Sequence, residues 1–255
     1  MSIEFEENEA GTNEPPAKTS LMERLTNVIV SPGEAFDEIK GVAVDANNWM
    51  LPMAIMILAG IVFSVTVFSQ EGVIENMLAA QEAQFEKRVE DGQMSEQEVE
   101  QARKAMGAFM NPKLLMAVSS AASVFFTPMV WAVLAFFFHW IVRIGSKSHI
   151  PFSKCFEVIG LSSVVSVLGI LVNMLLVILT GNVAMSLSLA LAFENYDPTN
   201  STHALAAEVD VMRFWYIGVL SIAWSRLTNH PVASCATWIL GSWIAFRVGT
   251  IVLFS

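Results

Sequence analysis

Two long segments without a charged side chain constrain this protein more than any other feature of its sequence. Residues 114–142 and 158–180 contain no Asp, Glu, Lys or Arg, and a short basic segment, 143–154, joins them. Each segment exceeds the roughly 20 residues that a helix needs to cross about 30 Å of hydrocarbon. Because a bilayer offers no water to unpaired backbone amides, we predict that the two segments form a transmembrane helical hairpin.

The composition agrees with an integral membrane protein. The chain is 54% hydrophobic and 15% charged, with a mean hydropathy of +0.54. The net charge of -10 comes mainly from the N-terminal tail and one loop, which disfavours a nucleic-acid partner. The opening residues are acidic and polar, unlike a secretory signal, so we expect the first apolar segment to be retained as an anchor. Cys155 and Cys235 are too isolated to predict a disulfide or a metal site.

The region before the first apolar segment divides into two parts. Residues 1–20 are rich in Glu, Asn, Pro and Thr, and we expect them to form a disordered acidic tail. Residues 21–48 have apolar side chains at helical spacing, and the sequence SPGE at 31–34 predicts a second helix start with a capping box. These two amphipathic helices are expected either on the cytoplasmic membrane surface or packed under the transmembrane helices.

Residues 49–255 are expected to form an all-α transmembrane domain of about five helices. The predicted spans are 49–68, 114–142, 158–180, 211–226 and 232–254. Pro128 predicts a kink in the second span. The apolar segment 183–193 is too short to cross, so it is an interfacial or re-entrant helix or an extension of the third span, and we favour the interfacial helix.

A charged insert, residues 70–112, separates the first two spans. Apolar residues follow one helical stripe from Ile74 to Val89, Gly92 interrupts it, and the sequence SEQE at 95–98 predicts a capping box that starts a second helix. This pattern predicts an extramembrane helical hairpin. Its Glu-rich exterior is expected to be a solvated face, with a cation or partner site as the alternative. Between residues 194 and 210 we expect a polar loop.

The distribution of basic residues predicts the orientation of the chain. A cytoplasmic N-terminus places the basic segment 143–154 and Arg226 inside, and it leaves the loop 194–210, which has no Lys or Arg, outside. The basic residues of the insert are the exception, but most lie away from the membrane ends among many acidic residues. With five spans the C-terminus lies outside.

Three groups of short motifs resemble the Yip family of membrane proteins, the Ypt-interacting proteins and their bacterial relatives. The motifs are LMERL (21–25) with SPGEAF (31–36) and WMLP (49–52), RIG (143–145) with FSKCF (152–156) and VIGLSS (158–163), and DVMRFW (210–215) with Gly218. The resemblance implies a five-span helical domain with a cytoplasmic N-terminus, in a bacterial inner membrane. Eukaryotic members of this family bind Rab-type GTPases and act in vesicle traffic, whereas the bacterial relatives have no settled role. Where the family commonly has Tyr and Pro, this chain has Leu161 and Val164-Val165.

Several polar residues fall in or near the expected spans, where an ionisable group is costly and is a functional candidate. These candidates are His139, Glu157, Asn173, Asp210 and Arg247. His139 and Glu157 lie near the cytoplasmic ends of adjacent spans and either meet or extend toward the interface. Arg247 can pair with Asp210 or Glu208, as a structural pair or as part of a transport site. Asn173 is expected to make an interhelical hydrogen bond.

Two function classes follow from these features. In the first, the protein is a membrane scaffold or adaptor that contacts a cytoplasmic protein or anionic lipid through Arg143, Lys147 and Lys154. In the second, it is a small-solute or ion permeation protein that uses the kinked second span and the interrupted third span. The sequence contains no signature of a catalytic, cofactor or metal site, so we do not expect an enzyme. Gly241, Ala245 and Gly249 form a small-residue helix face that is a candidate oligomer contact.

Overall fold

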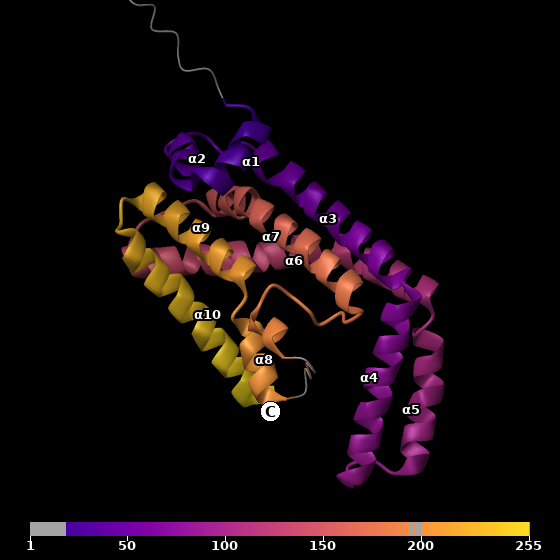
Figure 1. The fold of residues 1–255 in the computed structure, drawn as a ribbon. Helices are drawn as coiled ribbons and strands as arrows, with labels where there is room; N and C mark the ends of the chain where they lie inside the picture. Colours follow the sequence, from indigo (N-terminus) through magenta and orange to yellow (C-terminus); the bar gives the residue numbers. More distant parts are fainter. Residues whose placement is uncertain (1–18, 194–195, 197–199, 255) are drawn as a thin grey trace, which may run out of the picture.

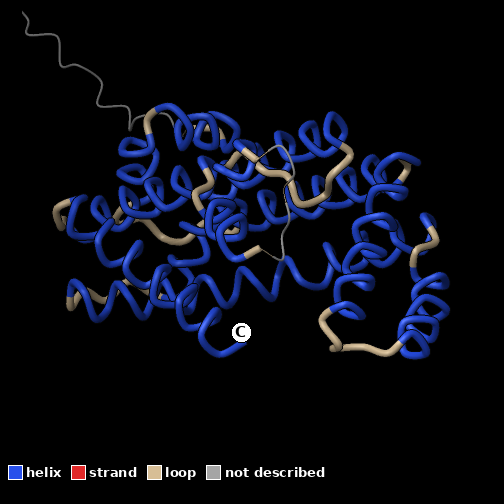
Figure 2. The backbone as a smooth tube through the Cα atoms, turned by 60° about the horizontal axis from the view of Figure 1, so that its bottom comes forward, coloured by secondary structure: helices blue, strands red, loops and turns tan. Residues whose placement is uncertain are grey.

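The computed structural model describes residues 19–193, 196 and 200–254. This part of the chain consists of helices joined by loops, and one isolated β-bridge pairs Ser188 with Asp210 (Figure 2). The helices are α1 (Leu21–Val30), α2 (Pro32–Ile39), α3 (Asn47–Phe68), α4 (Glu71–Glu90), α5 (Glu96–Phe109), α6 (Pro112–Ser146), α7 (Phe152–Thr180), η1 (Leu189–Ala192), α8 (Ser201–Glu208), α9 (Val211–Thr228) and α10 (Val232–Phe254). The predicted disordered tail lies outside the described residues, except for Thr19 and Ser20.

Helices α3, α6 and α7 pack together, and α3 contacts both of the others (Figure 1). They contain 22, 35 and 29 residues, and each is long and apolar enough to cross a membrane. At about 1.5 Å per residue, α6 is longer than the roughly 30 Å of hydrocarbon that it would cross. The all-α class and the membrane character predicted from the sequence are therefore confirmed.

The outer surface of α6 is apolar. Phe125 is 75% exposed, and the neighbouring side chains of Phe126, Phe136, Phe137 and Trp140 are also exposed. Aromatic rings left in water over such an area would oppose folding, whereas contact with lipid tails removes that cost. This surface therefore contacts the lipid bilayer.

Local sequence sets the ends of the long helices. The Asn111 side chain accepts a hydrogen bond from the Lys113 backbone N–H, with an O···N distance of 2.9 Å, and Pro112 occupies the first helical position of α6. Helix α6 ends at Ser146, and the next residue, Lys147, has a φ of 53° in the left-handed region. Helix α7 begins after Pro151, so both helices extend beyond the predicted spans. In the second surface helix Pro32 occupies the predicted position, but Ser31 makes no capping hydrogen bond through its side chain.

The helices alternate in direction between two ends of the molecule. At one end, α1 and α2 pack on the start of α7 and the end of α9 (Figure 1). At the other end of α3, the α4–α5 hairpin extends away from the remaining helices (Figure 1). We call the first the cap end, since α1 and α2 cover it, and the second the hairpin end. The sequence allowed two positions for α1 and α2, on the cytoplasmic membrane surface or under the transmembrane helices. In the structure they pack under the bundle.

Two predicted segments differ in the structure. The apolar segment 183–193 is not an interfacial helix: residues 183–188 run as a loop, Ser188 pairs with Asp210, and only the short η1 follows. The predicted polar loop 194–210 contains α8, whose first backbone N–H groups donate hydrogen bonds to the Asn200 side chain. The predictions depended on the composition and length of the two segments, whereas the Ser188–Asp210 bridge and the Asn200 cap of α8 set their structure.

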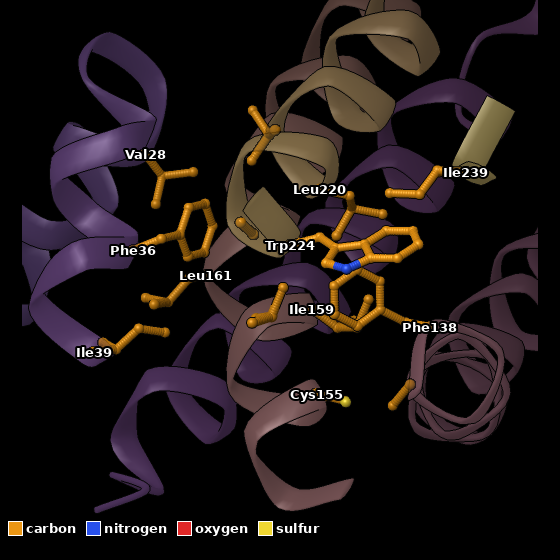
Figure 3. Close-up of a cluster of buried hydrophobic side chains, with 14 of the residues drawn as sticks. Val28, Phe36, Ile39, Phe138, Cys155, Ile159, Leu161, Leu220, Trp224 and Ile239 are labelled. Atoms are coloured by element: carbon orange, nitrogen blue, oxygen red, sulfur yellow. The ribbon is translucent and has the colours of Figure 1, made fainter. Parts of the chain in front are cut away.

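A hydrophobic core joins the cap end to the long helices. Figure 3 shows Phe36 and Val28 on one side of α7, near Leu161, and Trp224 with Phe138 on the other side. All five side chains are at most 4% exposed. The two short N-terminal helices are thus a packed part of the fold.

Candidate functional site

A buried ion pair lies at the start of α7. Lys154 and Glu157, three residues apart in the helix, form a salt bridge, and their side chains are 8% and 1% exposed. The Lys154 ammonium also donates a hydrogen bond to the Ile39 carbonyl oxygen at the end of α2, with an N···O distance of 3.0 Å. A cation is favoured at a helix C-terminus, so this contact stabilises α2 as well as the lysine charge.

Glu157 connects α7 to the start of α3 and, through it, to α1. One Glu157 oxygen accepts hydrogen bonds from the Asn48 side chain and from the Asp45 backbone N–H. The Asn48 side-chain oxygen in turn accepts a hydrogen bond from Arg24, at 2.7 Å. Arg24 also pairs with Glu38 of α2, with an N···O distance of 3.2 Å. We call these five side chains the cap network: Arg24, Glu38, Asn48, Lys154 and Glu157.

The cap network is possible because α3 and α7 approach closely at Gly160. A Cβ atom at this glycine would lie 2.5 Å from the Asn48 carbonyl oxygen and 2.5 Å from the Trp49 Cα, which is too close for any other residue without a backbone shift. The glycine therefore allows α3 to start directly against α7. This packing holds Asn48, which is 1% exposed, within reach of Glu157.

A second set of contacts joins α2 to the turn between α9 and α10. Arg226 pairs with Asp37 at 3.1 Å, and Lys40 donates a hydrogen bond to the Asn229 side chain at 2.6 Å. The Arg226 guanidinium lies over Gly33, where a Cβ atom would be 2.7 Å from it. Among the polar contacts of α2, the one with α7 is the buried hydrogen bond from Lys154, and those with Arg226 and Asn229 are exposed.

Two of the three predicted basic contact residues are exposed near the cap end. Arg143 and Lys147 are exposed, together with the apolar side chains of Trp140, Ile144 and Phe152. No ion pair in the described part of the chain involves Arg143 or Lys147. We call these five residues the basic surface.

Lys154 differs from the sequence expectation, because its ammonium group is buried in the cap network and cannot meet a partner or a lipid headgroup. The sequence carried a signal for this position, since Lys154 and Glu157 are opposite charges at helical spacing. Arg24, Glu38 and Asn48 were not predicted as site residues. Arg24 lies beside the apolar stripe of α1, and its side chain is turned inward and is only 14% exposed.

His139 does not take Glu157 as its partner. Its Nδ1 atom lies 2.9 Å from the Ile150 carbonyl oxygen and 3.9 Å from the Cys155 sulfur. Glu157 faces α3 and Cys155 faces α6, because the two residues are about 200° apart around α7. The prediction considered only the depth of His139 and Glu157 along their helices. Because α7 turns Glu157 toward α3 and away from α6, the two side chains do not meet.

At the hairpin end, one carboxylate joins α8, α9 and α10. Glu208 forms ion pairs with Arg213 of α9 and with Arg247 of α10. Arg213 also lies over the Trp243 ring, 5.6 Å from its centroid. Asp210, the other candidate partner of Arg247, instead caps α9 by accepting a hydrogen bond from the Arg213 backbone N–H at 2.9 Å. These contacts join α8 to the two helices that follow it.

A model of the Yip1 domain matches residues 26–254, which is most of the chain. The protein belongs to the Yip1-domain family. The family resemblance inferred from the short motifs is therefore confirmed. The matched range begins within α1 and ends with α10, so it includes the whole α4–α5 hairpin. No curated protein and no solved structure matches the chain significantly.

The Yip1 domain of this chain contains a pocket between α3, α6 and α7, on the side of the hairpin end. Its volume is about 410 Å³. The lining residues are Gly60, Phe63, Ser64, Phe68, Ser119, Ser123, Ile170, Asn173, Val177, Val183, Ala184, Met185 and Ser186. The predicted interhelical hydrogen bond of Asn173 is not formed: its side-chain oxygen is buried and has no partner among the described residues.

The α4–α5 hairpin of the Yip1 domain is stabilised by local contacts. Its two helices contribute the buried side chains of Phe85 and Val99, and Arg103 pairs with Glu82 at the surface. The predicted capping box is present: Ser95 N–H donates to Glu98 at 2.8 Å, and Glu98 N–H donates to the Ser95 hydroxyl at 3.3 Å. Hydrogen bonds from the Ser95 backbone and hydroxyl hold the pKa of Glu98 below its ordinary value.

The candidate oligomer face of the Yip1 domain lies on α10. Gly241 and Ala245 are exposed, and a Cβ atom at Gly241 would have no atom within 4 Å. The exposure of Gly249 lies outside the described residues. In the described part of the chain, no group of three or more His, Cys, Asp or Glu residues could hold a metal ion.

Proposed function

We propose that this Yip1-domain protein is a membrane adaptor without catalytic activity, which holds a cytoplasmic protein at the inner membrane of a bacterium. In this proposal α9 and α10 cross the bilayer together with α3, α6 and α7, which gives five spans. The N-terminus and the cap end face the cytoplasm, and the hairpin end faces outward. The proposal is supported by the alternating direction of the helices and by the exposed basic residues near the cap end.

The cap network is the single observation that carries the proposal. Its ion pairs and hydrogen bonds hold α1 and α2 in place. These two helices are too short to cross the membrane. Burying charged groups costs several kcal/mol per ion in desolvation, which complete pairing offsets. Such an arrangement is reasonable if the cap must present a rigid surface beside the membrane.

The basic surface supplies the contact in this proposal. Arg143 and Lys147 provide positive charge, and Trp140, Ile144 and Phe152 provide exposed apolar area around it. A partner with acidic and apolar side chains fits this combination, since charge steers the encounter and aromatic contacts hold the complex. The Rab-type GTPases bound by eukaryotic relatives set a precedent for a soluble protein partner.

Permeation is less well supported, because the core fills the cap half of the bundle. Trp131, Phe138, Leu161 and Trp224 are each at most 4% exposed, and they belong to the one core cluster that also contains Phe36 and Ile39 of the cap end. The pocket lining contains Asn173, but His139 is not part of it. A solute that entered the pocket would therefore meet packed side chains before it reached the cap end.

The proposal is tested by crosslinking in intact membranes. A photoreactive residue at Ser148, between the two basic residues and the start of α7, should capture a cytoplasmic protein, and the double variant R143E/K147E should lose most of that capture. The matched control is K87E/K104E, which reverses two charges on the hairpin instead and should leave capture unchanged. Equal capture by both double variants would refute the basic surface as the contact site. Capture of phospholipid alone from the same position would replace the protein partner with anionic lipid.

A further inference from the structure

The pocket between α3, α6 and α7 has no part in the proposed adaptor function. Asn173 lies seven residues before the end of α7, about 10 Å along the helix axis at 1.5 Å per residue. Ser119 lies seven residues after the start of α6, at a similar distance from that end. The pocket therefore lies at the depth of the lipid tails and below the loop of residues 183–186, which lines it at the hairpin end.

The polar atoms of the pocket are unusual for this depth. The Ser64 hydroxyl of α3 donates to the Met116 carbonyl oxygen of α6, and the Ser123 hydroxyl donates to the Ser119 carbonyl oxygen one turn earlier in α6. Both donors are thus used, which leaves the hydroxyl oxygen lone pairs as acceptors. The Asn173 side-chain oxygen is buried without a partner in the described part of the chain. An unpaired buried acceptor is costly, and a ligand that donates a hydrogen bond removes that cost.

The lining also defines which charge a ligand can carry. It contains no Asp, Glu, Lys, Arg or His, so a phosphate or an ammonium group in the pocket would lose its hydration without gaining a counter-charge. Phe63, Phe68, Ile170 and Val177 provide apolar contacts around the polar atoms. The volume of about 410 Å³ falls within the range of roughly 300–1,000 Å³ that is typical of small-ligand pockets.

We propose that this pocket binds an uncharged, hydroxyl-bearing headgroup of the glycerol type, with Asn173 accepting a hydrogen bond from a ligand hydroxyl. The ligand is a lipid such as a monoacylglycerol, because the pocket lies at tail depth and an acyl chain can remain in the bilayer beside it. Ser64, Ser119 and Ser123 surround the remaining hydroxyl groups. This binding is independent of the basic surface, which lies near the cap end.

The test uses the purified full chain in phosphatidylcholine nanodiscs with three photoreactive lipids that share one diazirine-bearing acyl chain. The first is a monoacylglycerol, the second a methyl ester without a hydroxyl, and the third a lysophosphatidic acid with a charged headgroup. The monoacylglycerol should label residues on α3, α6 or α7 that line the pocket, and it should do so several-fold more than either of the other lipids. N173L should reduce this labelling about tenfold, as expected for one lost hydrogen bond in a site without water.

Matched variants keep the test independent of folding. S119V removes a second polar group of the lining and should reduce labelling as well, whereas S166A removes a hydroxyl of α7 outside the lining and should not. Size-exclusion chromatography checks that each variant remains folded. The proposal is overturned if N173L and S119V both label like the native chain. Equal labelling by the methyl ester or by the charged lipid also overturns it.

One further arm identifies the source of the hydroxyl groups. Excess free glycerol should compete weakly, because it lacks the acyl chain. If a low excess of glycerol abolishes labelling, the pocket still recognises hydroxyl groups, but its ligand is a soluble polyol and the lipid assignment is overturned. Labelling only on the exposed face of α6, around Phe125 and Phe126, would indicate bulk lipid and contradict the proposal.

Discussion

The cap end and the α4–α5 hairpin use the same pairs of residue types in opposite surroundings. In the cap, Arg24 and Glu38 have side chains that are 14% and 29% exposed, and Arg24 has a further partner in Asn48. In the hairpin, the side chains of Arg103 and Glu82 are 46% and 41% exposed. Water screens the second pair, and exposed ion pairs of this kind contribute little to stability. The environment, and not the pairing itself, decides how strongly a charge is coupled to the fold.

The difference also concerns how each region is connected to the membrane helices. The cap touches α3, α7 and α9 through buried side chains, so it cannot move without exposing charges and core residues. In the described part of the chain the hairpin is fastened at its base, where Val73 packs on Val67 and Val177 and where Asn76 donates a hydrogen bond to the Gly181 carbonyl oxygen. We therefore expect the cap to unfold with the bundle and the hairpin to unfold independently.

The largest effect is expected from K154A. The substitution leaves Glu157 as a buried charge without its counter-ion, which typically costs about 3–5 kcal/mol. The free energy of unfolding in bicelles measures the loss. The double variant K154M/E157L removes both charges and should recover most of it, because the desolvation penalty disappears with the pair. A K154A chain as stable as the native one would show that Glu157 is not held as an ion.

A smaller effect is expected from R24Q. This variant removes the donor to Asn48 and the partner of Glu38, and hydrogen bonds to charged groups contribute roughly 1.5–3 kcal/mol each when they are buried. Since Glu38 is partly exposed, the loss should lie near the lower value. Protease accessibility of the α1–α2 segment in nanodiscs should rise together with it. If the cap stays protected, its apolar contacts alone are sufficient.

A local effect on the hairpin is expected from S95A, with a defined pH dependence. Because the folded pKa of Glu98 is lowered below 4.5, the stability that it contributes is complete above that value and is lost as the pH falls through the folded pKa. The protection factors of amide hydrogens at the start of α5, which correct each exchange rate for its intrinsic pH dependence, should therefore fall on acidification of the native chain. In S95A these protection factors should already be low at neutral pH and should change less with pH. The exchange rates of α3 and α7 serve as the internal control.

The smallest effect is expected from R103Q, the hairpin counterpart of R24Q. Hydrogen bonding to Glu82 raises the pKa of Arg103, but the pair is exposed, and we expect no measurable change in global unfolding. Salt should abolish any residual difference, because exposed charges are screened within about a Debye length. A destabilisation equal to that of R24Q would refute the distinction between the two ends.

The sequence alone was sufficient for features that depend on neighbouring residues. The uncharged segments predicted α6 and α7, and the order Ser95 to Glu98 predicted a capping box, because periodicity and caps act over a few residues. The prediction for segment 183–193 failed for the complementary reason, since Ser188 forms a backbone bridge with Asp210, which lies 22 residues later in the chain. The residue types of this segment do not indicate that pairing.

What the sequence by itself determined is the solvent of this protein: long uncharged segments require hydrocarbon, and short amphipathic ones require an interface or a core. Only the tertiary structure decided which polar groups meet. It turned Arg24 inward, it buried Lys154 against Ile39 and Glu157, and it left the side-chain oxygen of Asn173, a residue of the pocket lining, buried without a partner among the described residues. The physical reason is that depth along a helix follows from residue number, whereas the direction in which a side chain faces its neighbour depends on how whole helices rotate and pack.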